Sequence, residues 1–152
     1  MKNKLTLAIL LLVSSFCLLT LRAGTSEQEK AFTDKYKTAY EAKDTATLES
    51  FLYTEKANPM ALEFYKMMVT NGAGDKISSI ELVALTPEDT KKAAEPMDGP
   101  GGMKMKLPLQ PTRKLKLSVE HKDANGSSTS TSESFVAEKD GKLVIPVPVD
   151  AK

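Results

Sequence analysis

The single histidine of the chain, His121, is the residue best suited to acid–base chemistry. An imidazole side chain changes its charge near neutral pH, as a general acid or base must. His121 follows the alternating apolar and polar residues of 115–120, so a regular strand would place it on their apolar face. The sequence favours the alternative, a polar residue at a strand end beside a turn at Asn125-Gly126.

Metal and cofactor binding have little support. The one cysteine lies in an N-terminal apolar stretch, and a lone histidine has no second histidine at metal-binding spacing. Met97, Met103 and Met105 offer soft sulfur ligands for copper, but packing of strands and loops explains them more simply. The glycine-rich segments 71–76 and 99–102 lack the features of a phosphate-binding loop. We expect no metal and no cofactor.

The charge of the chain gives no reason to expect nucleic acid or an anionic membrane as a partner. The formal net charge is +1, from 21 basic and 20 acidic residues. Lysine on the outer faces of two predicted strands could attract an acidic partner. The alternative, which the sequence favours, is that these lysines keep the strand edges from pairing with another chain. The basic residues concerned are Lys104, Lys106, Arg113, Lys114 and Lys116.

The N-terminus has the pattern of a cleavable signal peptide. Lys2 and Lys4 precede an uncharged stretch over residues 5–21, and Ala23 is followed by small residues. We predict that residues 1–23 direct export and are removed after Ala23.

Removal of this segment would leave one domain, residues 24–152, in the periplasm or outside the cell. The absence of disulfides from an exported domain favours a bacterial source. After cleavage we expect no membrane association. The alternatives are a retained N-terminal membrane anchor and lipidation of Cys17.

The exported part divides near Asn71 into a helical half and a strand half, which predicts an α+β domain. Ser26 and Glu29 would form the capping box of the first helix, Asp44 would cap the second, and Asn58 would cap the third. The apolar sides predicted for the three helices are, in order, Phe32, Tyr36, Ala39 and Tyr40; Leu48, Phe51 and Leu52; and Met60, Phe64, Met67 and Met68.

The second half predicts strands joined by tight turns. Alternating residues indicate strands over 76–85, 103–107 and 115–120. Asn125-Gly126 and Asp140-Gly141 then predict two hairpins, and with them a meander of three antiparallel strands.

Two further segments of this half carry many prolines. The stretch 86–102, rich in proline and glycine, predicts a loop with no more than a short helical turn near its start. Pro146 and Pro148 remove donors from one side of the last strand, so we expect an edge strand or pairing that stops near Ile145. The alternate residues Leu143, Ile145 and Val147 would face the core.

The order of these elements resembles the nuclear transport factor 2-like superfamily, whose fold is a cystatin-like α+β cone. Residues 40–44 (YEAKD) are similar to an Ala-x-Asp step common at the end of its first helix. Residues 135–145 (FVAEKDGKLVI) resemble its closing hairpin. The resemblance spans residues 26–149, and the order of elements carries it.

The resemblance implies three N-terminal helices packed on a curved antiparallel sheet of four to five strands. The cone between them holds a ligand, a catalytic site or only side chains, and many members form homodimers through the sheet. In such a cone Tyr36, Tyr40, Phe64 and His121 would line a pocket for a small hydrophobic ligand.

We expect an exported module that binds a small molecule or another protein, without catalysis. The alternative is a cone enzyme of the isomerase, cyclase or hydrolase kind, which would act on a small hydrophobic substrate through His121 or a carboxylate. A third reading is a structural accessory protein with a filled cone. One fold serves many functions, so the resemblance does not choose among these uses.

Overall fold

The computed structural model describes residues 25–99, 102–124 and 126–151. The predicted signal peptide and its cleavage point lie outside these residues, as do the alternatives of a membrane anchor and of lipidation at Cys17. No helix within the described residues is long and apolar enough to span a membrane.

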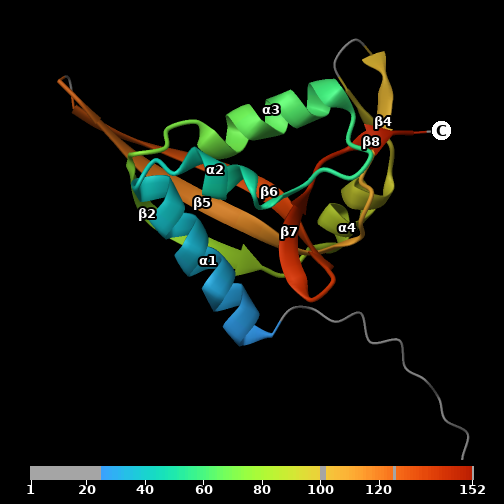
Figure 1. Cartoon of the computed structure of the whole chain (residues 1–152), viewed down its shortest axis with the longest axis horizontal. Coiled ribbons are helices and arrows are strands. Elements are labelled where there is room, and N and C mark those ends of the chain that lie inside the picture. Colours follow the sequence, from blue (N-terminus) through green and yellow to red (C-terminus); the bar gives the residue numbers. More distant parts are fainter. Residues whose placement is uncertain (1–24, 100–101, 125, 152) are drawn as a thin grey trace, which may run out of the picture.

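The architecture is α+β, as the sequence predicts (Figure 1). A sheet of five strands has the order β1-β7-β6-β5-β2, and a separate small sheet has the order β3-β4-β8. The elements are α1 (Ser26–Glu41), α2 (Thr45–Glu49), β1 (Leu52–Tyr53), α3 (Pro59–Thr70), β2 (Lys76–Val83), α4 (Pro87–Ala94), β3 (Met97–Asp98), β4 (Lys104–Lys106), β5 (Pro111–Asp123), β6 (Gly126–Lys139), β7 (Lys142–Pro146) and β8 (Val149–Asp150).

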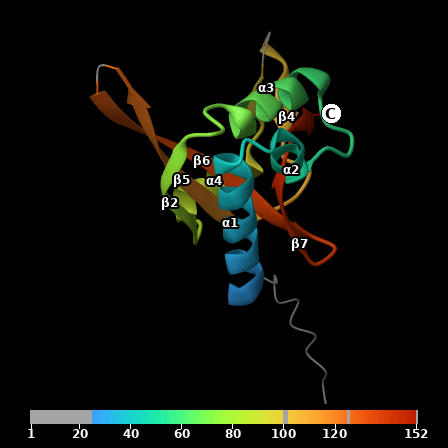
Figure 2. The same ribbon diagram turned by 60° about the vertical axis from the view of Figure 1, so that its left-hand side comes forward.

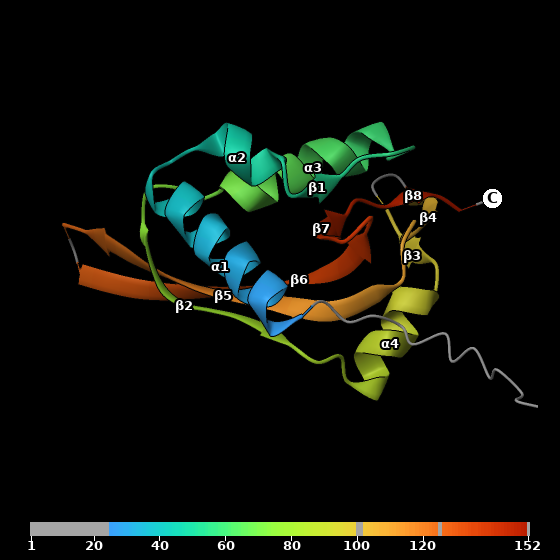
Figure 3. The same ribbon diagram turned by 60° about the horizontal axis from the view of Figure 1, so that its bottom comes forward.

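The three N-terminal helices lie together on one side of the large sheet, and α1 crosses it in front of β5 and β2 (Figures 1 and 3). The sheet is mixed rather than purely antiparallel, because β1 runs parallel to β7. The prediction of an antiparallel sheet is therefore wrong for this one pair, which joins residues too distant in sequence for local patterns to reveal.

The starts of the helices follow the capping signals, with one shift. The capping box of α1 is formed by Thr25 and Gln28, not by Ser26 and Glu29. Asp44 accepts a hydrogen bond from the N–H of Thr47 and caps α2 as predicted. Asn58 likewise caps α3, because its side chain accepts hydrogen bonds from two backbone N–H groups of the first turn.

Two predictions about helix extent are wrong. Helix α2 ends at Glu49, so Leu52 lies in β1 rather than on the helix. The stretch predicted as a loop contains α4, a helix of 8 residues. Its capping box joins Thr86 and Asp89, and Pro87 occupies the first turn, where its missing N–H costs nothing. The many prolines and glycines that follow obscured this start signal.

The predicted meander is confirmed: β6 pairs antiparallel with both β5 and β7. Its β6–β7 ladder ends at the pair Ala137 and Val144, as the prolines predicted. Ile145 instead donates its N–H to the carbonyl of Phe51, just before β1, at 2.8 Å, and Val147 donates to the carbonyl of Tyr53 in β1 at 3.1 Å. The nitrogen of Pro146, between them, faces away from β1. No ladder continues on that side, so the lack of an N–H there loses no hydrogen bond.

The core fills the space between the helices and the sheet. Phe32, Tyr36 and Phe51 pack their rings against one another, with centroids 4.8 to 6.3 Å apart. The predicted inward residues of the last strand, Leu143 and Ile145, are buried, as is Val147 just beyond it. The hairpin of β5 and β6 extends past this core to one side (Figure 2).

Candidate functional site

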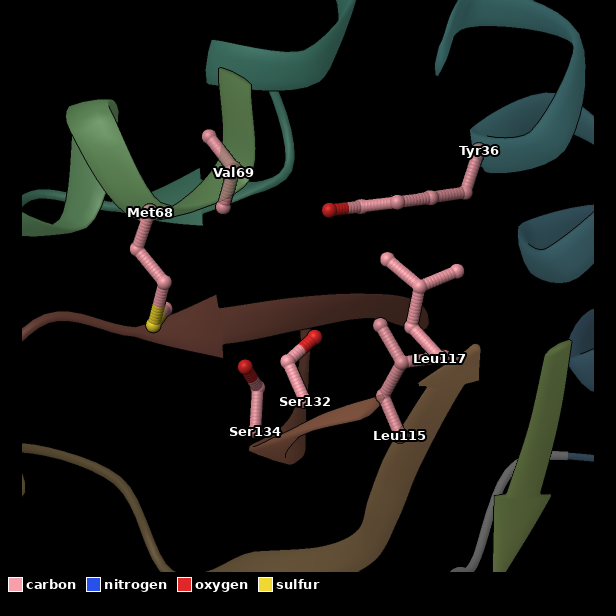
Figure 4. A pocket seen from close by; sticks show the side chains of 7 residues that line it. All are labelled: Tyr36, Met68, Val69, Leu115, Leu117, Ser132 and Ser134. Atoms are coloured by element: carbon pink, nitrogen blue, oxygen red, sulfur yellow. The ribbon is translucent and has the colours of Figure 1, made fainter. Parts of the chain in front are cut away.

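The interior of the predicted cone is almost completely filled. The cavity between α1, α3 and the β5–β6 hairpin has a volume of about 10 Å³ (Figure 4). This is roughly the space of one water molecule, far below the several hundred Å³ of a ligand pocket. Its lining consists of Tyr36, Met68, Val69, Leu115, Leu117, Ser132 and Ser134.

Tyr36 is the only one of the proposed pocket residues that lines this cavity. Its hydroxyl points into the space (Figure 4). Burial raises the pKa of this hydroxyl, and the neighbouring Tyr40 raises it further. Tyr36 therefore remains neutral and acts as a core side chain with one polar atom.

A polar cluster lies beside the cavity and contains His121. Nδ1 of the imidazole lies 2.6 Å from Oδ2 of Asp75, and Nε2 lies 2.8 Å from Oγ of Ser130. The hydroxyl of Tyr40 donates a hydrogen bond of 2.6 Å to the carbonyl of Asn71. Burial raises the pKa of Tyr40, and the negative charge of Asp75 adds to the effect.

Gly72 brings Tyr40 and His121 together. A Cβ atom at this position would lie 2.7 Å from Oη of Tyr40 and 3.1 Å from Cε1 of His121. Gly72 also has a φ of +73°, which glycine adopts without strain. The glycine-rich turn after α3 thus packs its backbone against two of the predicted site residues.

The cluster is half exposed. The side chains of His121 and Asp75 are 36% and 39% exposed, and Ser130 is exposed. Water therefore reaches the imidazole, and the hydrogen bonds of the cluster are weaker than they would be in a dry pocket.

The fourth predicted pocket residue, Phe64, lies apart from the other three. Three of the four residues predicted for the apolar face of α3 are exposed: Met60, Phe64 and Met67 are 47%, 53% and 61% exposed. The fourth, Met68, packs against the core and lines the cavity. The buried residues of α3 are instead Ala61 and Val69, which lie on other sides of the helix. We call Met60, Phe64 and Met67 the outer face of α3.

A groove beside the outer face has apolar walls. It has a volume of about 280 Å³ and lies between α3 and the small sheet, with Phe64, Tyr65, Met97 and Met105 among its lining residues. Met97 and Met105 are opposed on β3 and β4. A Cβ at Gly99 would lie 2.1 Å from Cε of Met105, so this glycine and the methionine side chain pack closely.

Met97 and Met105, two of the three methionines considered as copper ligands, are neighbours on β3 and β4. Within the residues that the structure describes, no three His, Cys, Asp or Glu side chains are grouped as metal ligands. Met105 is buried in the core cluster and Met97 packs against it, as expected from the packing interpretation of these methionines.

The basic residues of the two strands are largely paired with carboxylates. Lys114 contacts Asp89 at 2.9 Å and Glu133 at 3.1 Å, and Glu133 also contacts Lys116. Arg113 forms a 2.7 Å ion pair with Glu29. This pairing neutralises much of the positive charge that might have attracted an acidic partner.

Sequence reasoning missed Asp75 and Ser130. Asp75 follows the helix-terminating glycines, and only the fold brings it to His121. Ser130 is opposite Val119 in the β5–β6 register, and therefore lies diagonally across from His121 on the same face. The turn predicted with Asn125-Gly126 at its centre gives a different register, with Ser130 directly opposite His121. In the structure Gly126 is already part of β6 and pairs with Asp123, so the sequence did not predict the diagonal placement of Ser130.

Comparison with known proteins does not identify a family. No family model matches the chain, and no curated protein sequence matches it. A solved structure, the helical cell shape determining protein Pgp2 from Campylobacter jejuni, is similar with a TM-score of 0.38 and 12% sequence identity. The match covers 76% of this chain and 37% of that protein, so the chain spans well under half of its length.

Proposed function

We propose that the protein is an exported protein-interaction module of the nuclear transport factor 2-like kind, and that the outer face of α3 is its docking surface. The order of three helices, a long strand and a meander supports the proposed family. The observation that carries the interaction role is the pairing of a filled interior with three large apolar side chains left exposed on one helix face.

The filled interior argues against a small molecule held inside the cone. A cavity of about 10 Å³ excludes even a small hydrophobic ligand. Binding at the surface needs no such space, and the groove beside Phe64 is large enough to accept one apolar side chain of a partner.

The outer face has the properties of a docking surface. Met60, Phe64 and Met67 recur at intervals of four and three residues and so form a continuous stripe. Methionine and phenylalanine are enriched where proteins bind others, because they offer a large and adaptable apolar area. The flanking charges are of both signs, since Lys66 lies 3.7 Å from Glu63 and 3.8 Å from Glu49. We infer a partner segment with an apolar anchor and no strong net charge.

Selection of peptides from a random display library tests this proposal. The selected peptides should share a Leu, Phe or Trp anchor and should bind Phe64→Ser at least about tenfold more weakly than the wild type. Thr70→Ser, on the polar side of α3, is the matched control and should bind normally. Failure to enrich any peptide, or equal binding to Phe64→Ser, would show that the outer face is not a docking surface.

A second candidate function is ester hydrolysis at the polar cluster, which the Asp75–His121–Ser130 chain of hydrogen bonds favours. In the tautomer with a proton on Nδ1, His121 donates to Asp75 and its Nε2 accepts from Ser130. Ser130 could then attack an ester carbonyl while His121 takes the hydroxyl proton and returns it to the leaving alcohol. Water would release the acid and regenerate Ser130 by the same transfers.

Hydrolysis of p-nitrophenyl acetate tests this second function. Ser130→Ala and His121→Ala should both abolish turnover above the background rate, whereas Ser132→Ala should retain it. A fluorophosphonate probe should label the wild type and leave Ser130→Ala unlabelled. Equal rates in the wild type and the three variants would mean that the cluster does not hydrolyse esters and is only a structural contact.

A further inference from the structure

Strand β6 has a long side without a strand partner. It pairs with β5 from Gly126 to Ala137, but with β7 only over residues 137–139. Within the described residues, the side of β6 away from β5 therefore has no ladder over residues 126–136. Residues 126–133 are exposed, and the hairpin projects from the body of the domain (Figures 1 and 2).

The backbone groups on this side can be assigned from the register. Asp123 and Gly126 close the hairpin turn and exchange both of their hydrogen bonds. Successive N–H groups of a strand point to opposite sides, so those of Ser127, Thr129 and Thr131 point to the free side of β6. The same parity places the N–H of Ala137 towards β7, with which it is paired.

The free side lacks the usual protection of an edge strand. Natural edges carry lysine, proline or a bulge that discourages pairing with another chain. Residues 126–132 contain no charge and no proline, only glycine, serine and threonine. By contrast β2, a terminal strand of the same sheet, carries Lys76 and Glu81. The nearest charge on β6, Glu133, is neutralised by Lys114 and Lys116.

We propose that two copies of the protein pair through the free sides of their β6 strands, antiparallel and centred on Ser130. This arrangement puts Thr129 of each copy opposite Thr131 of the other, and hydroxyl pairs of this kind stabilise adjacent strands. Glu133 lies opposite Ser127 of the second copy, so no like charges meet.

A second copy fits this edge better than an unrelated strand does. The pairing is two-fold symmetric, so one contact satisfies the free backbone groups of both β6 strands and closes on itself. The occupant must itself be an uncharged, exposed strand edge, and the chain supplies one. The proposal is independent of the outer face of α3, which lies on a different element.

Sedimentation equilibrium of the purified protein tests the pairing. The wild type should be a dimer, and Thr129→Pro should weaken dimerisation by at least about tenfold, because proline removes a donor from the free side alone. Thr129→Val keeps that donor and should remain dimeric. Thr129→Lys, which tests the edge without proline, should also be monomeric. Phe64→Ser should stay dimeric, which separates this proposal from the docking role of α3.

A cysteine pair tests the register. In a chain carrying Cys17→Ser, Ser130→Cys should form an interchain disulfide, because residue 130 faces itself across the axis at a Cα separation of about 4.5 Å. Ser128→Cys should not, since its two copies would lie roughly 14 Å apart along the strands. A monomeric wild type, a dimeric Thr129→Pro, or equal cross-linking at both positions would overturn the proposal.

Discussion

The imidazole of His121 lies 2.6 Å from the carboxylate of Asp75, and this contact ties the outer half of β5 to the turn that follows α3. Because both side chains are more than one third exposed, we expect a modest contribution to stability. His121→Ala should lower the free energy of unfolding by about 0.5–1 kcal/mol in urea titrations. A loss as large as that of a core truncation would mean that the cluster supports the fold far more than its exposure suggests.

Substitution of Gly72 should disturb the same cluster. Gly72→Ala places a methyl group within 2.7 Å of Oη of Tyr40 and forces alanine into a positive φ. Gly141→Ala is the matched control, because its φ is also positive and no atom lies within 4 Å of the added carbon. The φ effect alone should cost each variant about 1–2 kcal/mol. Thermal unfolding should show an additional loss for Gly72→Ala, and equal losses would mean that the cluster adapts without cost.

Asp89 should make the stability of the protein sensitive to acid. The N–H of Thr86, the ammonium of Lys114 and the hydroxyl of Thr86 all stabilise its carboxylate and lower its pKa to about 2. The unfolded value is about 3.9. Because the pKa of Asp89 is lower in the folded state, its ionised carboxylate stabilises the fold at pH values above the unfolded pKa. This contribution is lost as the pH falls towards 2.

Asp89→Asn should therefore be less stable than the wild type at neutral pH and should lose less stability between pH 4 and pH 2. Chemical denaturation across this range measures the difference. Glu88→Gln removes one carboxylate from the same helix and serves as the control. Parallel pH profiles for the wild type and Asp89→Asn would contradict the assignment.

The outer face of α3 should contribute little to folding. Phe32→Ala removes a buried ring that packs against Phe51 and should cost about 3–5 kcal/mol. Phe64→Ser removes an exposed ring and should change stability by no more than about 0.5 kcal/mol. Differential scanning calorimetry compares the two variants. A large loss for Phe64→Ser would indicate that the stripe is kept for stability rather than for docking.

Local patterns in the sequence predicted most elements of the fold. The α+β class, the caps at Asp44 and Asn58 and the turn at Asp140-Gly141 depend on residues within a few positions of one another, and all are observed. The first hairpin also forms, but Gly126 pairs with Asp123 and belongs to β6 rather than to the turn. Helix α4 was missed although its capping signal is local, because the neighbouring prolines and glycines dominated the interpretation of that stretch.

The contacts between distant segments could not be predicted in this way. Helical spacing identified the stripe at Met60, Phe64 and Met67 as apolar, but a period of 3.6 residues does not reveal which side of a helix the rest of the chain covers. Helix α3 has apolar residues over more than one side, and the fold buries Ala61 and Val69. Likewise, the approach of Asp75 to His121 depends on how the turn after α3 meets β5.

The parallel pair of β1 and β7 has a consequence for how the chain reaches its native state. The N–H of Ile145 bonds to the carbonyl of Phe51, and the N–H of Asn58 bonds to the carbonyl of Pro148. The helical half is thus completed only by residues from the last part of the chain. Contacts of such large sequence separation form late and slow folding. A nascent chain emerging from the ribosome cannot form these hydrogen bonds until synthesis is nearly finished. A truncation before β7 should therefore leave the helices without a stable tertiary structure.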